Sequence, residues 1–314
     1  MSMKRIWPIV WLTFLYFFTA CPISGQVGEK PQVNKDKDKD NSSRFIRLSR
    51  DEKNQPVALE SAIVRYVPKD RRKNAPVVDL VTAVHIGEKS YYEQLNREFE
   101  GYDAVLYELV APEGTRVPKG GGAGSGSFIS MLQKAMKNVL ELEFQLQMID
   151  YTRPNFVHAD MSPAQFAESM NKRGESMLSM FIKIMMSAMA QQDPQNSNAS
   201  DAQLLMALFD KNRAMVLKRI MAEQFQSMDG MLSAIEGANG STLISDRNKI
   251  ALDVLRKQIG EGKKKLAIFY GGGHMPDIDK RLRNQFGLVP VSTRWLVAWD
   301  LKGESKPAES EKKP

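Results

Sequence analysis

The sequence predicts an α/β protein with a mainly parallel central sheet flanked by helices, carrying a Met-rich helical insertion or cap. Apolar, β-branched runs such as 77–84 are typical of strands that are buried on both faces. The run at 104–110 repeats this pattern, and residues 90–99 between the two have apolar side chains at helical spacing. A strand, a helix and a strand joined by short connections form a βαβ unit, whose two strands are parallel.

The other elements of the core follow in chain order. Residues 58–67 alternate as a strand does, and 69–74 form a polar turn before the first buried strand. After a helical middle, the alternation of sheet and helix returns. It comprises an amphipathic helix at 246–259, a buried strand at 266–270, a glycine turn at 271–273, a helix at 276–286 and one or two closing strands within 289–300.

The middle of the chain is predicted to be an insertion. Residues 119–127 are rich in Gly and Ser but lack the Gly-Lys-Ser/Thr ending of a phosphate-binding loop, which favours a linker or a lid. Residues 128–235 are mostly helical in pattern, with a short strand at 155–157 and a capped helix start at Ser162-Pro163-Ala164-Gln165. The apolar stretch 177–189 is too short to span a bilayer, so we expect a buried or lid helix there.

The first 25 residues are predicted to be an export signal. Lys4 and Arg5 precede the apolar run 6–20, which has the length of a signal-peptide core. The only cysteine, Cys21, follows Ala20 in a context similar to a lipoprotein box. Two alternatives remain: lipid attachment at Cys21, which would tether the chain to a membrane, and conventional cleavage after Gly25. Either way we expect an exported protein of the cell envelope, periplasmic or membrane-anchored.

Polar segments are predicted to bound the domain at 57–301. Residues 26–56, with their Lys-Asp alternation, indicate a disordered tether, and 302–314 a disordered tail. The net charge of +7 is spread along the chain without interleaved aromatic residues, so the sequence does not favour nucleic acid as a partner.

The three histidines of the chain fall at or near the ends of predicted strands. His85 ends the strand at 77–84, and His158 ends the one at 155–157, with Asp160 two residues further on. His274 follows the glycine turn, and Glu108 lies inside the strand at 104–110. Because ligands bind beyond the carboxyl ends of parallel strands, these residues are the candidate site.

Each candidate also has a purely structural interpretation. A histidine at a strand end can be a surface residue, and His158 with Asp160 could simply orient the loop before the capped helix. A carboxylate inside a buried strand needs a partner, which for Glu108 could be a structural Arg. Arg247 lies in the first turn of a predicted helix, where the macrodipole disfavours a cation. This suggests a carboxylate partner, Glu108 or a substrate, unless the side chain is exposed.

Four short sequence motifs resemble those of a known protein family. They are Thr82-Ala83-Val84-His85-Ile86-Gly87, Tyr102-Asp103-Ala104-Val105-Leu106-Tyr107-Glu108-Leu109, Ser245-Asp246-Arg247-Asn248 and Gly271-Gly272-Gly273-His274-Met275. In this order they resemble the TraB/PrgY/GumN family, which includes the Tiki-type proteases. The resemblance covers about residues 58–300, with the helical middle similar only in character. Thr82 departs from the pattern, since the first motif normally has Gly at that position.

The resemblance implies an α/β core related to erythromycin-esterase-like hydrolases and, in Tiki-like members, metal-dependent peptide hydrolysis. Carried over, His85 and His274 would be metal ligands, Glu108 a third ligand or the general base, and Arg247 the stabiliser of a developing oxyanion. Two imidazoles and a carboxylate suit Zn²⁺ or Mn²⁺ with a position open for water. The esterase-like alternative needs no metal, because a His can act as the base while Arg holds the anion. His158 and Asp160 complete the set of candidate catalytic residues.

The sequence leaves three functions open. The first is an exported hydrolase acting on a peptide or small-molecule substrate, with or without a metal. The second is a non-catalytic protein that binds a peptide or small ligand in the same crevice, since a fold can be kept while its chemistry is lost. The third is an envelope scaffold whose Met-rich helices form the contact surface.

Overall fold

The computed structural model describes residues 44–70, 74–112, 114–115, 117–120, 140–176, 179, 210, 212–236 and 240–302, with the backbone alone for 225–235. Three predicted segments lie wholly or almost wholly outside these ranges: the signal segment 1–25, the helix at 177–189 except residue 179, and the tail 302–314 except its first residue. So does most of the glycine-rich loop at 119–127. The α/β class is confirmed, while the Met-rich insertion as a whole cannot be compared with the structure.

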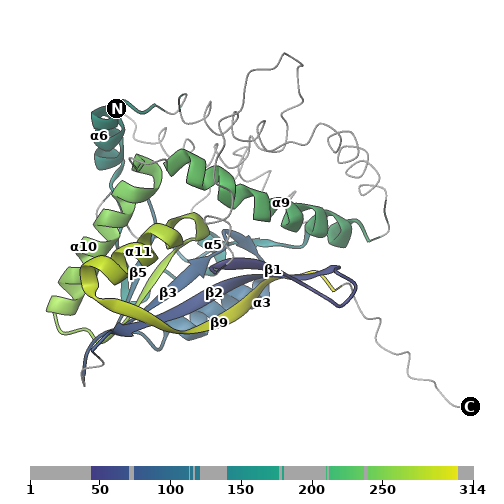
Figure 1. Cartoon of the computed structure of the whole chain (residues 1–314), viewed down its shortest axis with the longest axis horizontal. Helices are drawn as coiled ribbons and strands as arrows, with labels where there is room; N and C mark the ends of the chain where they lie inside the picture. The colour runs from purple at the N-terminus through teal and green to yellow at the C-terminus, as the bar shows by residue number, and fades with distance from the viewer. Residues whose placement is uncertain are drawn as a thin grey trace, which may run out of the picture.

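A mostly parallel sheet forms the centre of the described region (Figure 1). Its order is β1-β2-β3-β8-β5-β7, with β9 paired to the other edge of β2. The pairs β3/β8, β8/β5 and β5/β7 are parallel, whereas β2 pairs antiparallel with β1, β3 and β9. The strands are β1 Ile46–Arg50, β2 Pro56–Pro68, β3 Val77–Ala83, β5 Ala104–Tyr107, β7 Phe156–His158, β8 Lys265–Gly271 and β9 Leu288–Asp300.

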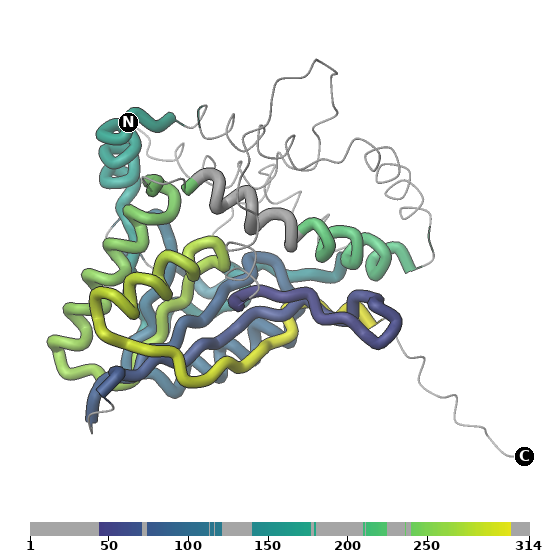
Figure 2. Tube along the Cα trace, viewed as in Figure 1, coloured from purple at the N-terminus to yellow at the C-terminus, as the bar shows by residue number. Residues whose placement is uncertain are grey.

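Helices cover both faces of this sheet. The helices are α3 Lys89–Phe99, α5 Gln145–Met148, α6 Pro163–Arg173, α9 Arg213–Glu236, α10 Arg247–Gly260 and α11 Met275–Phe286. A π-helical turn, Thr242–Asp246, leads into α10, and a 3₁₀ turn, Gly272–His274, leads into α11. A separate two-stranded antiparallel sheet pairs β4 Ile86–Gly87, which follows β3, with β6 Glu143–Phe144. Helix α9 packs against β1 and against both turns (Figure 2).

The strand pattern explains why two cores form. Alternate residues of β8 point to opposite faces, so Phe269 packs with α3 while Ile268 packs with α10 and α11. Leu95 of α3 and Leu255 of α10 are fully buried in these two clusters. The parallel strands are therefore buried on both sides, as their continuous apolar sequences indicate. Among the described residues, no helix combines the length and the apolar character needed to cross a membrane.

Most predicted elements are confirmed within a few residues, and the end of one predicted strand needs correction. The strand predicted at 104–110 ends at Tyr107, so Glu108 lies just beyond the strand rather than inside it. The segment 289–300 is part of one continuous strand, β9, because its whole length pairs with β2. The capping box at Ser162 is confirmed, since its hydroxyl accepts from Gln165 N and the Gln165 side chain accepts from Ser162 N.

The predicted tether at 26–56 extends too far toward the domain. Residues 46–50 of that range form β1, which pairs antiparallel with β2. Phe45 is 1% exposed and belongs to the core that α10 and α11 cover. The physical reason is that Phe45 and its apolar neighbours supply anchors that an all-polar segment lacks, and β2 offers an edge for pairing.

Candidate active site

The carboxyl ends of four parallel strands bring the candidate residues together. His85 follows the end of β3, Glu108 follows β5, Asp160 follows β7, and His274 follows β8 through the 3₁₀ turn. Parallel neighbours end at the same edge of a sheet, which is where crevices for ligands form. The fifth member, Arg247, comes from the first residue of α10.

Arg247 contacts three other members of this cluster: Asp160, Glu108 and His274. Its Nε lies 2.9 Å from Asp160 Oδ1, and its Nη2 lies 2.6 Å from Asp160 Oδ2 and 2.7 Å from Glu108 Oε1. The guanidinium is 6% exposed and the Asp160 carboxylate 0%. Burial alone would lower the pKa of Arg247, but the charges of Asp160 and Glu108 raise it above its usual value. The expected carboxylate partner of Arg247 is thus present, and Asp160 is a second one.

Both oxygens of Glu108 are hydrogen-bonded. Oε1 accepts from Arg247 Nη2 and lies 3.4 Å from His274 Nε2, while Oε2 accepts from the Gly271 amide at 2.7 Å. A Cβ atom at Gly271 would stand 3.1 Å from His85 Nε2 and 3.3 Å from Glu108 Oε2, so a side chain here would displace one or both of them. Burial raises the pKa of Glu108, yet the nearby His274 and Arg247 charges outweigh it and hold the pKa well below its usual value.

His274 is held on its other ring nitrogen by a buried amide. Its Nδ1 lies 2.7 Å from Asn248 Oδ1, and its ring stacks edge-on against Tyr270 at 5.2 Å between centroids. The remaining nitrogen, Nε2, therefore faces Glu108 Oε1 and Arg247 Nη1, each at 3.4 Å. Asn248 ends the motif Ser245-Asp246-Arg247-Asn248, but the sequence did not predict its contact with His274.

His85 is held in a similar way by Gln145, the first residue of α5. Its Nδ1 lies 2.9 Å from Gln145 Oε1, and Gln145 Nε2 bonds to the Tyr151 hydroxyl at 2.9 Å. These hydrogen bonds orient the His85 ring. They do not determine which of its nitrogens carries the proton, because the Tyr151 hydroxyl at their end can donate or accept. No local pattern marks Gln145, because it reaches the site through the pairing of β4 with β6.

His158 lies apart from the cluster. Its Nε2 is 2.6 Å from the Leu109 carbonyl oxygen, and its ring packs edge-on against Tyr107 of the neighbouring strand. These contacts join β7 to the segment after β5. The histidine therefore holds the loop that carries Asp160, which agrees with the structural interpretation of this residue, while Asp160 itself belongs to the cluster.

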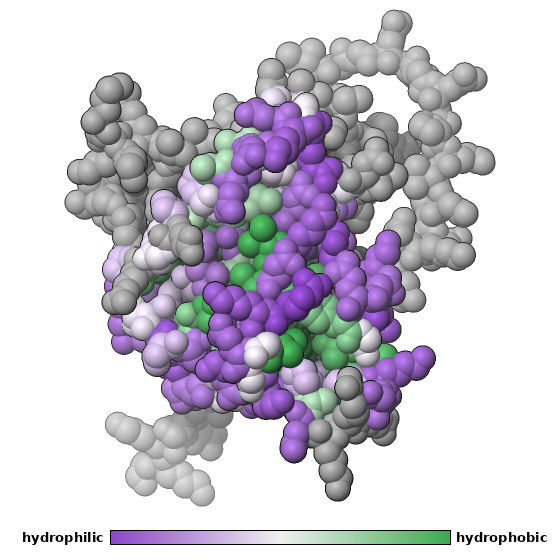
Figure 3. Space-filling model, turned by 90° about the vertical axis from the view of Figure 1, so that its left-hand side faces the viewer, coloured by the Kyte–Doolittle hydropathy of each residue, from purple (hydrophilic) through white to green (hydrophobic). Residues whose placement is uncertain are grey.

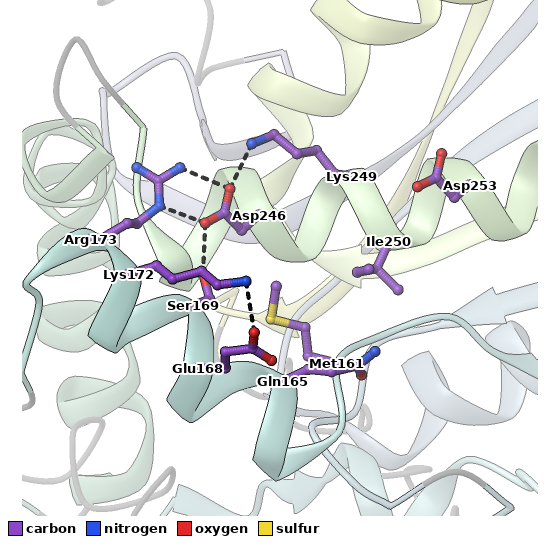
Figure 4. Close-up of a pocket in the computed structure, with 10 residues that line it drawn as sticks. All are labelled: Met161, Gln165, Glu168, Ser169, Lys172, Arg173, Asp246, Lys249, Ile250 and Asp253. Carbon is purple, nitrogen blue, oxygen red and sulfur yellow. Dashed lines mark hydrogen bonds and ion pairs between the residues drawn. The ribbon is translucent and has the colours of Figure 1, made fainter.

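An open cavity of about 520 Å³ lies beside the cluster, between α6 and α10. Met161, the neighbour of Asp160, and Asp246, the neighbour of Arg247, are among its lining residues. Figure 4 shows Arg173, Ser169 and Lys249 converging on Asp246 at the cavity wall. Figure 3 views the molecule from this side: hydrophilic residues dominate, with apolar ones between them.

The charges of the cluster do not balance. Glu108 and Asp160 contribute two negative charges against one positive charge on Arg247, so neutral histidines would leave one negative charge in excess. An imidazolium formed at His85 or His274 would compensate it. The site can therefore accept a proton without acquiring a net positive charge.

The donor set does not fit a divalent metal ion as it is arranged. In the described ranges, no three His, Cys, Asp or Glu side chains converge so as to hold a metal. Both Glu108 oxygens already accept hydrogen bonds. Arg247 Nη1 lies 3.4 Å from His274 Nε2, so a metal ion bound to His274 Nε2 would be repelled by the positive charge of Arg247. Metal dependence thus stays a prediction of the family resemblance.

Comparison of the chain with protein-family models, with characterised proteins and with solved structures finds no match. The similarity of the four motifs to the TraB/PrgY/GumN family therefore stays a prediction as well. The case for a function comes from the geometry of the site.

Proposed function

We propose that the chain is an exported hydrolase that cleaves a peptide or ester bond at the cluster of His85, Glu108, His274 and Arg247. The main support for this proposal is the position of the Glu108 carboxylate. Glu108 lies beside both imidazoles and an arginine at the carboxyl edge of the sheet. A proton acceptor, a group that stabilises its protonated form and a cation for a developing anion are what metal-free acyl hydrolysis needs.

His85 is the proposed general base. It is half-buried, whereas His274 and Arg247 are buried, so a substrate or a water molecule reaches His85 first. Its Nε2 takes a proton from water while the water oxygen bonds to the carbonyl carbon. The negative charge of Glu108 stabilises the imidazolium, as a carboxylate does in hydrolytic triads.

Arg247 is the proposed anion stabiliser. Its Nε and Nη2 are bound to carboxylates, whereas the contacts of Nη1 within the described ranges are two of 3.4 Å, to the Leu243 carbonyl oxygen and to His274 Nε2. Both contacts are long, so Nη1 is the nitrogen that we assign to the oxyanion, to which it donates in place of the Leu243 carbonyl when the carbonyl bond opens. The imidazolium of His85 then returns its proton to the leaving nitrogen or oxygen, the acyl bond breaks, and a carboxylic acid and an amine or alcohol are released.

The test is a hydrolysis screen of short peptides and simple esters with the purified full chain and three variants. We expect His85→Gln and Glu108→Gln to lower kcat/KM by roughly 100-fold or more, which is typical of losing general acid–base catalysis. His158→Gln is the matched control, since it removes an imidazole outside the cluster, and it should keep most of the activity. Ligand binding without turnover, unchanged in the His85→Gln variant, would contradict the proposal and support a non-catalytic binding protein.

A further inference from the structure

The side chain of Asn248 links His274 to Asp277 at the start of α11. Its Oδ1 lies 2.7 Å from His274 Nδ1. Its Nδ2 lies 2.8 Å from Asp277 Oδ2 and 3.2 Å from the His274 carbonyl oxygen. Asn248 is 0% exposed, so water does not compete for these contacts.

The neighbours of Asn248 determine which way its amide faces. Asp277 Oδ2 also accepts a hydrogen bond from Arg281 Nε at 2.7 Å, so it is an acceptor in this network. The backbone carbonyl of His274 is likewise an acceptor only. Two acceptors require the NH₂ group of Asn248 on their side, and the amide oxygen therefore faces the imidazole. Because an amide oxygen cannot donate, the proton of this contact belongs to His274 Nδ1.

We propose that Asp277 is a positioning residue which, through Asn248, holds His274 in the tautomer protonated at Nδ1. The other neutral tautomer would set two lone pairs against each other across 2.7 Å. His274 Nε2 then carries the lone pair and lies 3.4 Å from Arg247 Nη1, which can donate to it, and 3.4 Å from Glu108 Oε1, which cannot. In the other tautomer an Nε2–H group would face the guanidinium and the Glu108 carboxylate at equal distance, so the tautomer is set at Nδ1, by the contact with Asn248.

The consequence for hydrolysis rests on the proposed function, whereas the tautomer does not. Arg247 Nη1 is the nitrogen proposed to bind the oxyanion, and His274 Nε2 is one of its acceptors. A mixture of His274 tautomers would leave part of the molecules without a nitrogen acceptor for Arg247 Nη1. The tautomer of His85 is not fixed in this way, because its partner Gln145 bonds in turn to the Tyr151 hydroxyl, which can donate or accept.

The test is nitrogen NMR of the full chain labelled with ¹⁵N-histidine. Protonated and unprotonated ring nitrogens of histidine give well-separated signals, and the chain has only three histidines. The variants His85→Gln, His158→Gln and His274→Gln assign them by removal. We expect wild-type His274 to be protonated at Nδ1, and the ratio of the two tautomers to fall about tenfold in Asp277→Asn, as expected from losing one hydrogen-bond preference.

Asp253→Asn is the matched control. Asp253 also lies on a helix and bonds to an arginine in the next turn, Arg256, but it is exposed. This variant should leave the His274 signals unchanged. Protonation of wild-type His274 at Nε2, or an unchanged tautomer ratio in Asp277→Asn, would overturn the proposal. The wild-type spectrum tests the tautomer even if the Asp277 variant does not fold.

Kinetics separate the two proposals. If the chain hydrolyses a substrate, Asp277→Asn should lower kcat about tenfold with little change in KM, because the effect arises at the oxyanion rather than in substrate binding. A lower kcat with an unchanged tautomer ratio would overturn the inference about Asp277. The tautomer result with no hydrolysis in the wild type would overturn the proposed function alone.

Discussion

Arg247 and Asp160 form a buried ion pair through two parallel hydrogen bonds, of 2.9 and 2.6 Å, across 87 positions of sequence. Two-point contacts of this kind fix the plane of the guanidinium as well as its position. They leave Nη2 able to reach Glu108 and direct Nη1 toward His274. Asp160 therefore orients the arginine that the proposed chemistry uses.

Replacing Asp160 by Ala should lower the free energy of unfolding by about 3 kcal/mol. The buried guanidinium of Arg247 would then have one carboxylate partner, Glu108, instead of two. Denaturant titration at neutral pH measures this. The exposed pair of Asp253 with Arg256 provides the control, and Asp253→Ala should change stability by about 0.5 kcal/mol or less. Equal effects of the two substitutions would contradict the buried pair.

Gly271→Ala should abolish the proposed hydrolysis while the protein stays folded. The added Cβ would meet His85 Nε2 and Glu108 Oε2, which must move apart to admit it. Gly260→Ala is the control, since nothing lies within 4 Å of a Cβ there. Assays of both variants beside a thermal melt separate site geometry from stability, and full activity of Gly271→Ala would count against this arrangement.

Thr82 lies in a buried strand, and its hydroxyl is buried without a hydrogen-bond partner in the described part of the chain. Thr82→Val keeps the shape and removes that polar group. We expect it to stabilise the protein by up to about 1 kcal/mol, since an unpaired buried polar group is costly. A loss of stability, measured by denaturant titration, would show that the hydroxyl has a partner.

Asp246 should make the protein sensitive to acid. Hydrogen bonds from Arg173, then Lys249 and Ser169, outweigh partial burial and hold the pKa of Asp246 well below its usual value. A depressed folded-state pKa stabilises the protein above the unfolded pKa of about 4, and this stabilisation is lost as the pH falls through the folded pKa. Asp246→Asn should therefore cost about 2 kcal/mol at pH 7. The difference should shrink steadily below about pH 4, and a difference that does not depend on pH would refute the linkage.

The arrangement of Glu108 also predicts how the protein responds to chelators. Both its oxygens are engaged by Arg247 and Gly271, so hydrolysis should persist in the presence of EDTA. Metal analysis should find no stoichiometric zinc or manganese in the wild type. A His85→Ala/His274→Ala double variant should therefore have the same metal content as the wild type. Finding such a metal would favour the metal-dependent chemistry that the family resemblance implies.

The sequence was sufficient to predict most of the fold because its signals are local. Buried parallel strands have continuous apolar sequences, so 77–84 and 266–270 were recognisable, and the capping box at Ser162 uses residues three positions apart. Strand β1 was missed because it is short and mostly polar, and its stability comes from pairing with β2. The same locality placed His85, Glu108, Asp160 and His274 at strand ends.

By itself, then, the sequence determined the class of fold and the edge of the sheet at which the titratable residues gather, since both depend on neighbours in the chain. Only the tertiary structure decided the partners. It joined Arg247 to Asp160 and Glu108, placed Gln145 against His85, and left His158 outside the cluster. It also oriented Asn248 between His274 and Asp277. These choices depend on hydrogen bonds between segments far apart in sequence, whose direction is set by burial and by which atoms can only accept.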